Sequence, residues 1–182
     1  MKRKGKVQGL AEEFVKQCGF NYLVVSRMTE VGTRMATYYP NENKIIIDPR
    51  KIYQSHKRFK LSLMDFVHIL IARELGRSMD GLLEERNNKI DKAFQLIEKG
   101  FYFEQIKSYL VDLKSEEEEF ASMKGREFIN KEILDQYDNK CQRYHLSETS
   151  RIGVKAKLED LSSRLKGNSI ENNINEILKG DI

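Results

Sequence analysis

Two arginines four residues apart enclose a glutamate in the most informative segment of this 182-residue chain. The segment covers residues 67–80 and contains Arg73-Glu74-Leu75-Gly76-Arg77. Residues four apart lie on one face of a helix, so a helix here carries both guanidinium groups on the same side. A guanidinium group stays protonated and has no lone pair to offer, which makes it an ion-pairing group and not a metal ligand.

The same spacing with histidines is the H-E-x-x-H motif of zinc peptidases. In that motif two imidazoles on one helix face bind Zn²⁺, and the glutamate between them activates the metal-bound water. The helix of such enzymes reads roughly L-A-H-E-L-G-H. Residues 72 and 74–76 match it here, whereas Arg73 and Arg77 stand at the two histidine positions.

A later segment, Glu118-Glu119-Phe120-Ala121, fits the E-x-x-A pattern that supplies a third zinc ligand in these enzymes. With this segment, and with a predicted strand pair ahead of the helix, the chain resembles the ImmA/IrrE family over residues 7–138. These are small zinc metallopeptidases of phages and mobile elements. The resemblance implies a zincin-like α+β fold, and several members with intact motifs act on, or bind, helix-turn-helix repressors.

The two arginines place this chain among degenerate members without the zinc ligands. Each guanidinium charge about 4 Å from a divalent ion would cost about 8 kcal/mol at an effective dielectric constant of about 20. We therefore expect no catalytic residues, no bound metal and no cofactor. Arg73, Glu74, Arg77 and Glu118 are expected to form a degenerate-site pocket. In it Arg73 or Arg77 pairs with Glu118 or a neighbouring glutamate across two helices, and this ion pair replaces the link that the metal makes.

The leading functional hypothesis is a non-catalytic regulator that binds another protein. By analogy with the family, the partner is a repressor or another regulator of a phage or mobile element. Peptidases of this architecture hold substrates as an added strand, so recognition can outlast the loss of chemistry. The predicted partner-binding edge strand carries Tyr38, Tyr39, Lys44 and Ile46, with one of the two tyrosines facing the core and the other facing outward.

Two alternatives remain open at this point. The first is a metal-dependent hydrolase with a relocated site built from His68, Glu74, Asp80 and Glu118. The second is a nucleic-acid-binding protein, which is motivated by basic residues in two short segments. These are the opening run Lys2-Arg3-Lys4-Gly5-Lys6 and the cluster Lys57-Arg58 with Lys60.

The elements that position these residues follow from periodicity and turn residues. Apolar residues at helical spacing predict a helix over 7–18, and short apolar runs predict strands over 22–25, 33–39 and 44–47. Ser62 is a helix N-cap with Asp65 three residues later, and apolar residues recur at helical spacing after it.

Helices are then expected over residues 63–79, from Gly81 to about 113, over 115–137 and over 158–178. Residues 139–156 are expected to form a loop. This order predicts an α+β fold with a small antiparallel sheet in domain 1–138 and a helical extension over 139–182.

Composition fits one soluble domain in the cytoplasm. Charged residues make up 33% of the chain against 40% hydrophobic residues, and the net charge of +4 is too mild to indicate a general nucleic-acid binder by itself. Two cysteines far apart give no disulfide framework. No apolar run approaches about 18 residues, and no apolar core follows the N-terminal charges, so neither a membrane span nor a signal peptide is expected.

Overall fold

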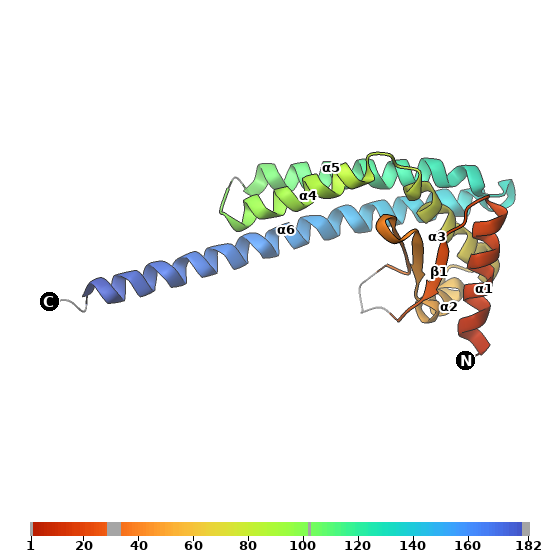
Figure 1. Ribbon diagram of the computed structural model, residues 1–182, viewed down its shortest axis with the longest axis horizontal. Coiled ribbons are helices and arrows are strands. Elements are labelled where there is room, and N and C mark those ends of the chain that lie inside the picture. The colour runs from red at the N-terminus through yellow and green to blue at the C-terminus, as the bar shows by residue number, and fades with distance from the viewer. Residues whose placement is uncertain (1, 29–33, 102, 180–182) are drawn as a thin grey trace. The chain divides into compact units, whose positions relative to one another are not determined.

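The computed structural model describes residues 2–28, 34–101 and 103–179, with side chains described for all of these except 2–4 and 167–179. These residues form six α-helices, three short strands and three single-turn 3₁₀ helices (Figure 1), which confirms the predicted α+β class. The α-helices are α1 (Lys2–Gln17), α2 (Pro49–Arg58), α3 (Leu63–Ser78), α4 (Leu83–Glu98), α5 (Phe103–Gly125) and α6 (Leu134–Lys179). The strands are β1 (Leu23–Ser26), β2 (Ala36–Tyr39) and β3 (Lys44–Ile47), and the 3₁₀ helices are Pro40–Glu42, Arg126–Phe128 and Lys131–Ile133.

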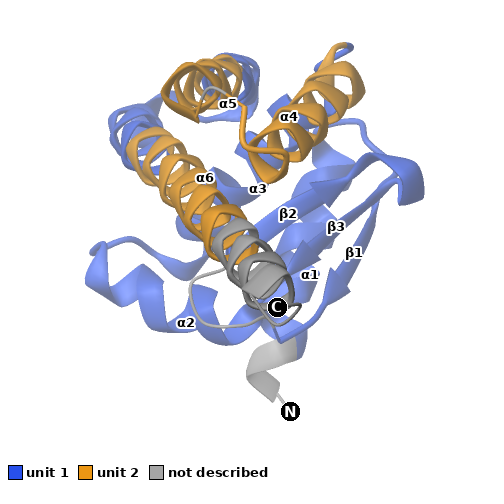
Figure 2. Cartoon of the chain, turned by 90° about the vertical axis from the view of Figure 1, so that its left-hand side faces the viewer, with its two compact units in different colours: residues 1–81, 117–144 blue, residues 82–116, 145–182 orange. Residues whose placement is uncertain are grey.

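The chain divides into two units, each assembled from two separate stretches (Figure 2). Unit 1 comprises residues 1–81 and 117–144 and contains the sheet, while unit 2 comprises residues 82–116 and 145–182. Helices α5 and α6 each pass from one unit into the other. The boundary expected after residue 138 lies inside α6. Residues 82–116, which were expected in one domain with the sheet, belong to unit 2.

The sheet of unit 1 is mixed, so the expectation of a wholly antiparallel sheet is wrong. Strand β3 is central: it pairs antiparallel with β2, where Tyr38 faces Ile45, and parallel with β1, where Val24 faces Ile45. The β2–β3 hairpin is connected by a 3₁₀ turn followed by Asn43, whose φ of 44° lies in the left-handed region. The proline and asparagines of this segment predict a turn here. Strand β1 is distant in sequence from the hairpin, and a short apolar run does not specify its direction or neighbour. Thr33, the predicted start of β2, lies outside the described residues.

Two side-chain caps fix where the helices after the hairpin begin. The Asp48 carboxylate accepts from the backbone N–H groups of Arg50 (3.0 Å) and Lys51 (3.2 Å), and a proline follows it at the first helical position of α2. Ser62 Oγ accepts from the backbone N–H of Asp65 at 3.0 Å, which confirms the predicted start of α3. Helices α1 and α3 contact each other, α1 contacts β1 and α3 contacts β2. Helix α3 is thereby set against the sheet.

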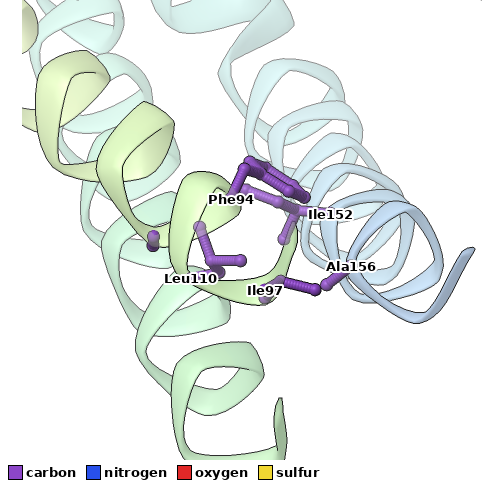
Figure 3. Packing of buried hydrophobic residues seen from close by; sticks show 6 residues of the cluster. Phe94, Ile97, Leu110, Ile152 and Ala156 are labelled. Carbon is purple, nitrogen blue, oxygen red and sulfur yellow. The ribbon is translucent and has the colours of Figure 1, made fainter. Parts of the chain in front are cut away.

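Unit 2 has its own apolar core, drawn from three helices (Figure 3). Phe94 and Ile97 of α4 meet Leu110 of α5 and the pair Ile152 and Ala156 of α6. The predicted continuous helix up to residue 113 is therefore wrong. The N–H of Gly100 donates to Ile97 O at 2.9 Å, and its φ of 78° lies in the left-handed region, which ends α4 and lets α5 begin at residue 103.

The expectation of a loop over residues 139–156 is also wrong, because this stretch lies within α6. Helix α5 ends at Gly125, and α6 begins at Leu134, where a single helix over 115–137 was expected. The residues that α6 buries recur at helical spacing, but they are of mixed chemical type. They include Cys141, Glu148, Ile152, Ala156 and Asp160. A search for apolar periodicity misses such a helix because polar and charged residues interrupt its buried face. The described part of the chain has no helix with the length and apolar character that a membrane span requires.

Helices α3 and α5 cross at unusually short range in unit 1. A Cβ on Gly76 would lie 2.1 Å from the carbonyl oxygen of Ala121 and 2.4 Å from the backbone nitrogen of Gly125. A Cβ on Gly125 would lie 2.5 Å from the carbonyl oxygen of Ala72. Small residues four apart on both helices therefore let the two backbones touch, and they bring the residues beside them within side-chain reach.

We expect Gly76→Ala to destabilise the protein by about 1–3 kcal/mol, since the added methyl group meets backbone and the helices must separate. Gly9→Ala is the matched control, because Gly9 lies within α1 with nothing within 4 Å of an added Cβ. Alanine there should be neutral or stabilising by up to about 1 kcal/mol. Urea denaturation of the two variants checks this, and equal effects would contradict the close crossing.

Candidate functional site

Arg77 is the centre of a buried ion-pair network between α3 and α5. Its side chain is 3% exposed and contacts three carboxylates. Nη1 donates to Glu74 Oε2 at 2.6 Å, Nε to Glu117 Oε1 at 2.7 Å, and Nη2 to Glu118 Oε1 at 2.7 Å. A guanidinium group suits this role because its donors are fixed in one plane and point in several directions.

Arg73 lies one turn earlier on α3 and shares two of these carboxylates. Its Nη1 donates to Glu74 Oε1 at 2.9 Å and its Nη2 pairs with Glu118 Oε2. The guanidinium carbon is 4.4 Å from the ring centre of Tyr144, a cation–π distance. Among the described residues Arg73 Nε has no hydrogen-bond partner. A third arginine, Arg34, donates from Nη2 to Glu118 Oε1 at 3.0 Å.

This arrangement confirms the expected ion pairs across two helices, since both Arg73 and Arg77 reach Glu118. Sequence reasoning missed Arg34, and it allowed for a glutamate beside Glu118 without naming Glu117. Two residues of the acidic run 116–119 are buried: Glu117 is 3% exposed and Glu118 is 1% exposed. The helical position of Glu117 next to Glu118 could have suggested its role, whereas no sequence signal marks Arg34.

Among the described ion pairs of this network, three arginines (Arg34, Arg73 and Arg77) face three glutamates (Glu74, Glu117 and Glu118). Burial alone would raise the pKa of Glu74, but the neighbouring Arg77, Arg73 and Arg34 outweigh it and hold that pKa below its ordinary value. Burial alone would lower the pKa of Arg77, and its carboxylate partners raise it well above normal instead. Glu74 and Arg77 are therefore charged at neutral pH, and the Glu74 carboxylate is not available as a general base.

The residues at this site do not fit a zinc ion. Positions 73, 77 and 118 converge, as three zinc ligands would, but two of them carry cationic groups without a lone pair. The relocated metal site is not formed either. His68 stacks on Phe14 of α1 with ring centres 4.1 Å apart, and no group of three or more His, Cys, Asp or Glu side chains in the described ranges is placed to hold a metal. His68, Glu74, Asp80 and Glu118 are therefore not one site.

The predicted edge strand is partly wrong. Lys44 and Ile46 lie on β3, which is the central strand, whereas Tyr38 and Tyr39 lie on β2 at one edge of the described sheet. Tyr38 is 9% exposed and Tyr39 is 41% exposed, so the expected alternation of the two side chains is confirmed. The N–H of Tyr38 points away from β3 and donates to Glu74 Oε2 at 3.0 Å. Helix α3 thus occupies a backbone donor that an added strand would need.

Comparison with known proteins gives no relative for this arrangement. No protein family, curated protein or solved structure matches the chain.

Replacing one carboxylate of the network should cost far more than replacing a surface carboxylate. We expect Glu118→Gln to destabilise the protein by about 3–5 kcal/mol, because it leaves buried arginines without compensating charge. Glu127→Gln is the control: Glu127 pairs with Lys124 at 2.9 Å on the surface, and its loss should cost at most about 1 kcal/mol. Urea denaturation at neutral pH measures both, and a similar cost for the two changes would contradict a buried network.

The network also predicts sensitivity to acid. Because the folded-state pKa of Glu74 is lowered, its stabilising contribution is present above the unfolded-state pKa of about 4.3 and is lost as the pH falls through the lower folded-state value. The free energy of unfolding should therefore fall more steeply below about pH 4 in the parent chain than in Glu74→Gln. Glu127→Gln should keep the parent slope. Parallel slopes for the parent and Glu74→Gln would show that Glu74 is not held by the arginines.

Proposed function

We propose that this chain is a non-catalytic, protein-binding regulator whose fold derives from a zinc peptidase of the ImmA/IrrE kind. One observation carries the proposal: the side chains at the positions of the two motif histidines and of the third ligand meet in one buried cluster. Arginines occupy the histidine positions, and the intervening Glu74 is held by Arg73, Arg77 and the N–H of Tyr38. The cluster links α3 to α5, as a metal would, without supplying an activated water.

The partner-binding surface follows from what the sheet leaves exposed. Strand addition to β2 is disfavoured, since Glu74 already binds the outward N–H of Tyr38. The side chain of Tyr39 is exposed on the same strand, and Lys44 Nζ lies 5.4 Å from its ring centre. An exposed tyrosine beside a cation suits a protein interface, where aromatic rings contribute large contact areas. We therefore place the partner, a regulator or repressor by family analogy, on this face and not along the strand edge.

The origin of the site is tested by restoring the histidines. The double variant Arg73→His/Arg77→His, with Glu118 retained, is expected to bind about one zinc ion per chain, whereas the parent chain retains none after dialysis. Adding Glu118→Gln to the double variant should abolish the gain, which separates a three-ligand site from adventitious binding. Elemental analysis measures this. A double variant that folds and takes up no zinc would contradict descent from a zinc peptidase.

The binding role is tested with a partner captured from the native cell and then purified. Titration should give an affinity at least about tenfold weaker for Tyr39→Ala, about 1.4 kcal/mol, as expected for an interface tyrosine. Tyr109→Ala is the matched control, because Tyr109 is also exposed but lies on α5 in unit 2. Unchanged binding by Tyr39→Ala, or cleavage of the partner by the parent chain, would overturn the proposal.

A further inference from the structure

Lys140 is a buried cation that pairs with no carboxylate among the side chains that the structure describes. It lies in the first turns of α6 and is 7% exposed, and it makes no hydrogen bond or ion pair with any described residue. Its Nζ lies 3.5 Å from the ring centre of Phe59, 5.2 Å from that of Phe66 and 5.0 Å from that of Tyr144. These rings stabilise an ammonium group only in part, because burying a charge without a counter-charge is costly.

The surroundings of Lys140 are themselves positive. Burial first, and then Arg143, Arg73 and Arg58, lower the pKa of Lys140 to about 8. Arg143 lies on the same helix, and its guanidinium carbon is 5.7 Å from the Phe59 ring centre. The ring of Phe59 therefore contacts both Lys140 and Arg143 of α6 beside the end of α2. These contacts keep two positive charges close together although they repel each other.

The end of α2 adds further cations to the same place. Residues 49–62 contain five Lys or Arg residues and no Asp or Glu. Lys57 and Arg58 occupy the last turn of α2, and Lys57 Nζ lies 6.0 Å from the ring centre of Tyr53. Two nearby carboxylates on neighbouring elements have other partners: Asp65 accepts from Ser62 and Asp138 pairs with Arg126.

Lys60 occupies a backbone position where glycine would be favoured. Its φ is 54°, in the left-handed region, and it closes α2 through the bonds Lys60 N–H to Lys57 O and Leu61 N–H to His56 O. This is the helix ending that usually carries glycine, and a residue with a Cβ there costs about 1 kcal/mol or more. A lysine at this strained position points to a use for its side chain.

We propose that Lys57, Arg58, Lys60 and Arg143, with Lys140 beneath them, form a basic patch that binds the phosphate backbone of a nucleic acid without sequence preference. Cations from two separate segments exceed what one free phosphate could contact, so a polymer of phosphodiesters fits better. Within residues 49–62 and 134–144, which the structure describes in full, no large apolar side chain is strongly exposed. The patch thus lacks the apolar centre that a protein interface or membrane insertion would use. This inference is independent of the proposed protein-binding role.

The decisive variant is Lys60→Gly, which separates binding from folding. It should keep or raise the melting temperature, because it relieves the left-handed lysine, and yet bind nucleic acid several-fold more weakly. Arg143→Gln should weaken binding to a similar degree. The probes are a fluorescently labelled single strand of about 20 nucleotides and the corresponding duplex, titrated with the full chain by fluorescence anisotropy between about 50 and about 200 mM salt. A plot of the logarithm of the association constant against the logarithm of the salt concentration has a negative slope. Each lost cation should make that slope shallower by about one.

Two controls decide where the binding resides. Lys107→Gln removes an exposed lysine of α5 in unit 2 and should leave affinity and salt slope unchanged. A variant in which the lysines and arginine of residues 2–6 become glutamine should retain the response to Lys60→Gly. The proposal is overturned if neither probe binds at low salt. It is also overturned if the loss follows residues 2–6 instead of the patch, or if polyglutamate or anionic vesicles bind more tightly than both nucleic acids.

Discussion

Arg77 imposes a constraint that the rest of unit 1 has to meet. Its guanidinium group cannot lose its proton under any physiological condition, yet its side chain is only 3% exposed. The fold therefore has to supply carboxylates in the plane of the guanidinium group. Glu74 comes from the preceding turn of α3, and Glu117 and Glu118 come from α5. Glu117 and Glu118 are adjacent on α5, so pairing both with this one charge restricts the rotation and the register of α5 against α3.

The backbone at the crossing is adapted to that requirement. Gly76 lies directly against Ala121 and Gly125, so the axes approach closely enough for short ion pairs on either side of the contact. Glu74 extends the same network to the sheet through the N–H of Tyr38. Buried ion pairs often add little net stability compared with apolar residues of similar size, whereas breaking one is costly. The network is therefore better understood as a device that specifies one packing of β2, α3 and α5.

The net charge of +4 combines two regions with different local charge: the buried ion-pair network and the end of α2. In the interior network, the three arginines and three glutamates of the described ion pairs cancel in the net charge. At the end of α2 the cations have no acidic residues beside them in the segment, and aromatic rings hold Lys140 and Arg143 close together. A sum over the chain cannot separate these cases, because partner recognition depends on local fields and not on total charge.

The sequence by itself determined the α+β class, the start of α3, the β2–β3 hairpin and the pairing of Arg73 and Arg77 with Glu118, whereas helix α2 was not predicted. These depend on local signals: side-chain caps, turn residues, and a spacing of four that places two guanidinium groups on one face. The tertiary structure alone decided that β1 lies parallel to β3, that Arg34 joins the network and Glu117 is the neighbouring glutamate in it, and that residues 139–156 continue one helix. Each of these depends on which distant residues meet. A buried face that mixes Cys141, Glu148 and Asp160 with apolar residues becomes recognisable only once the partners that neutralise or cover it are in place.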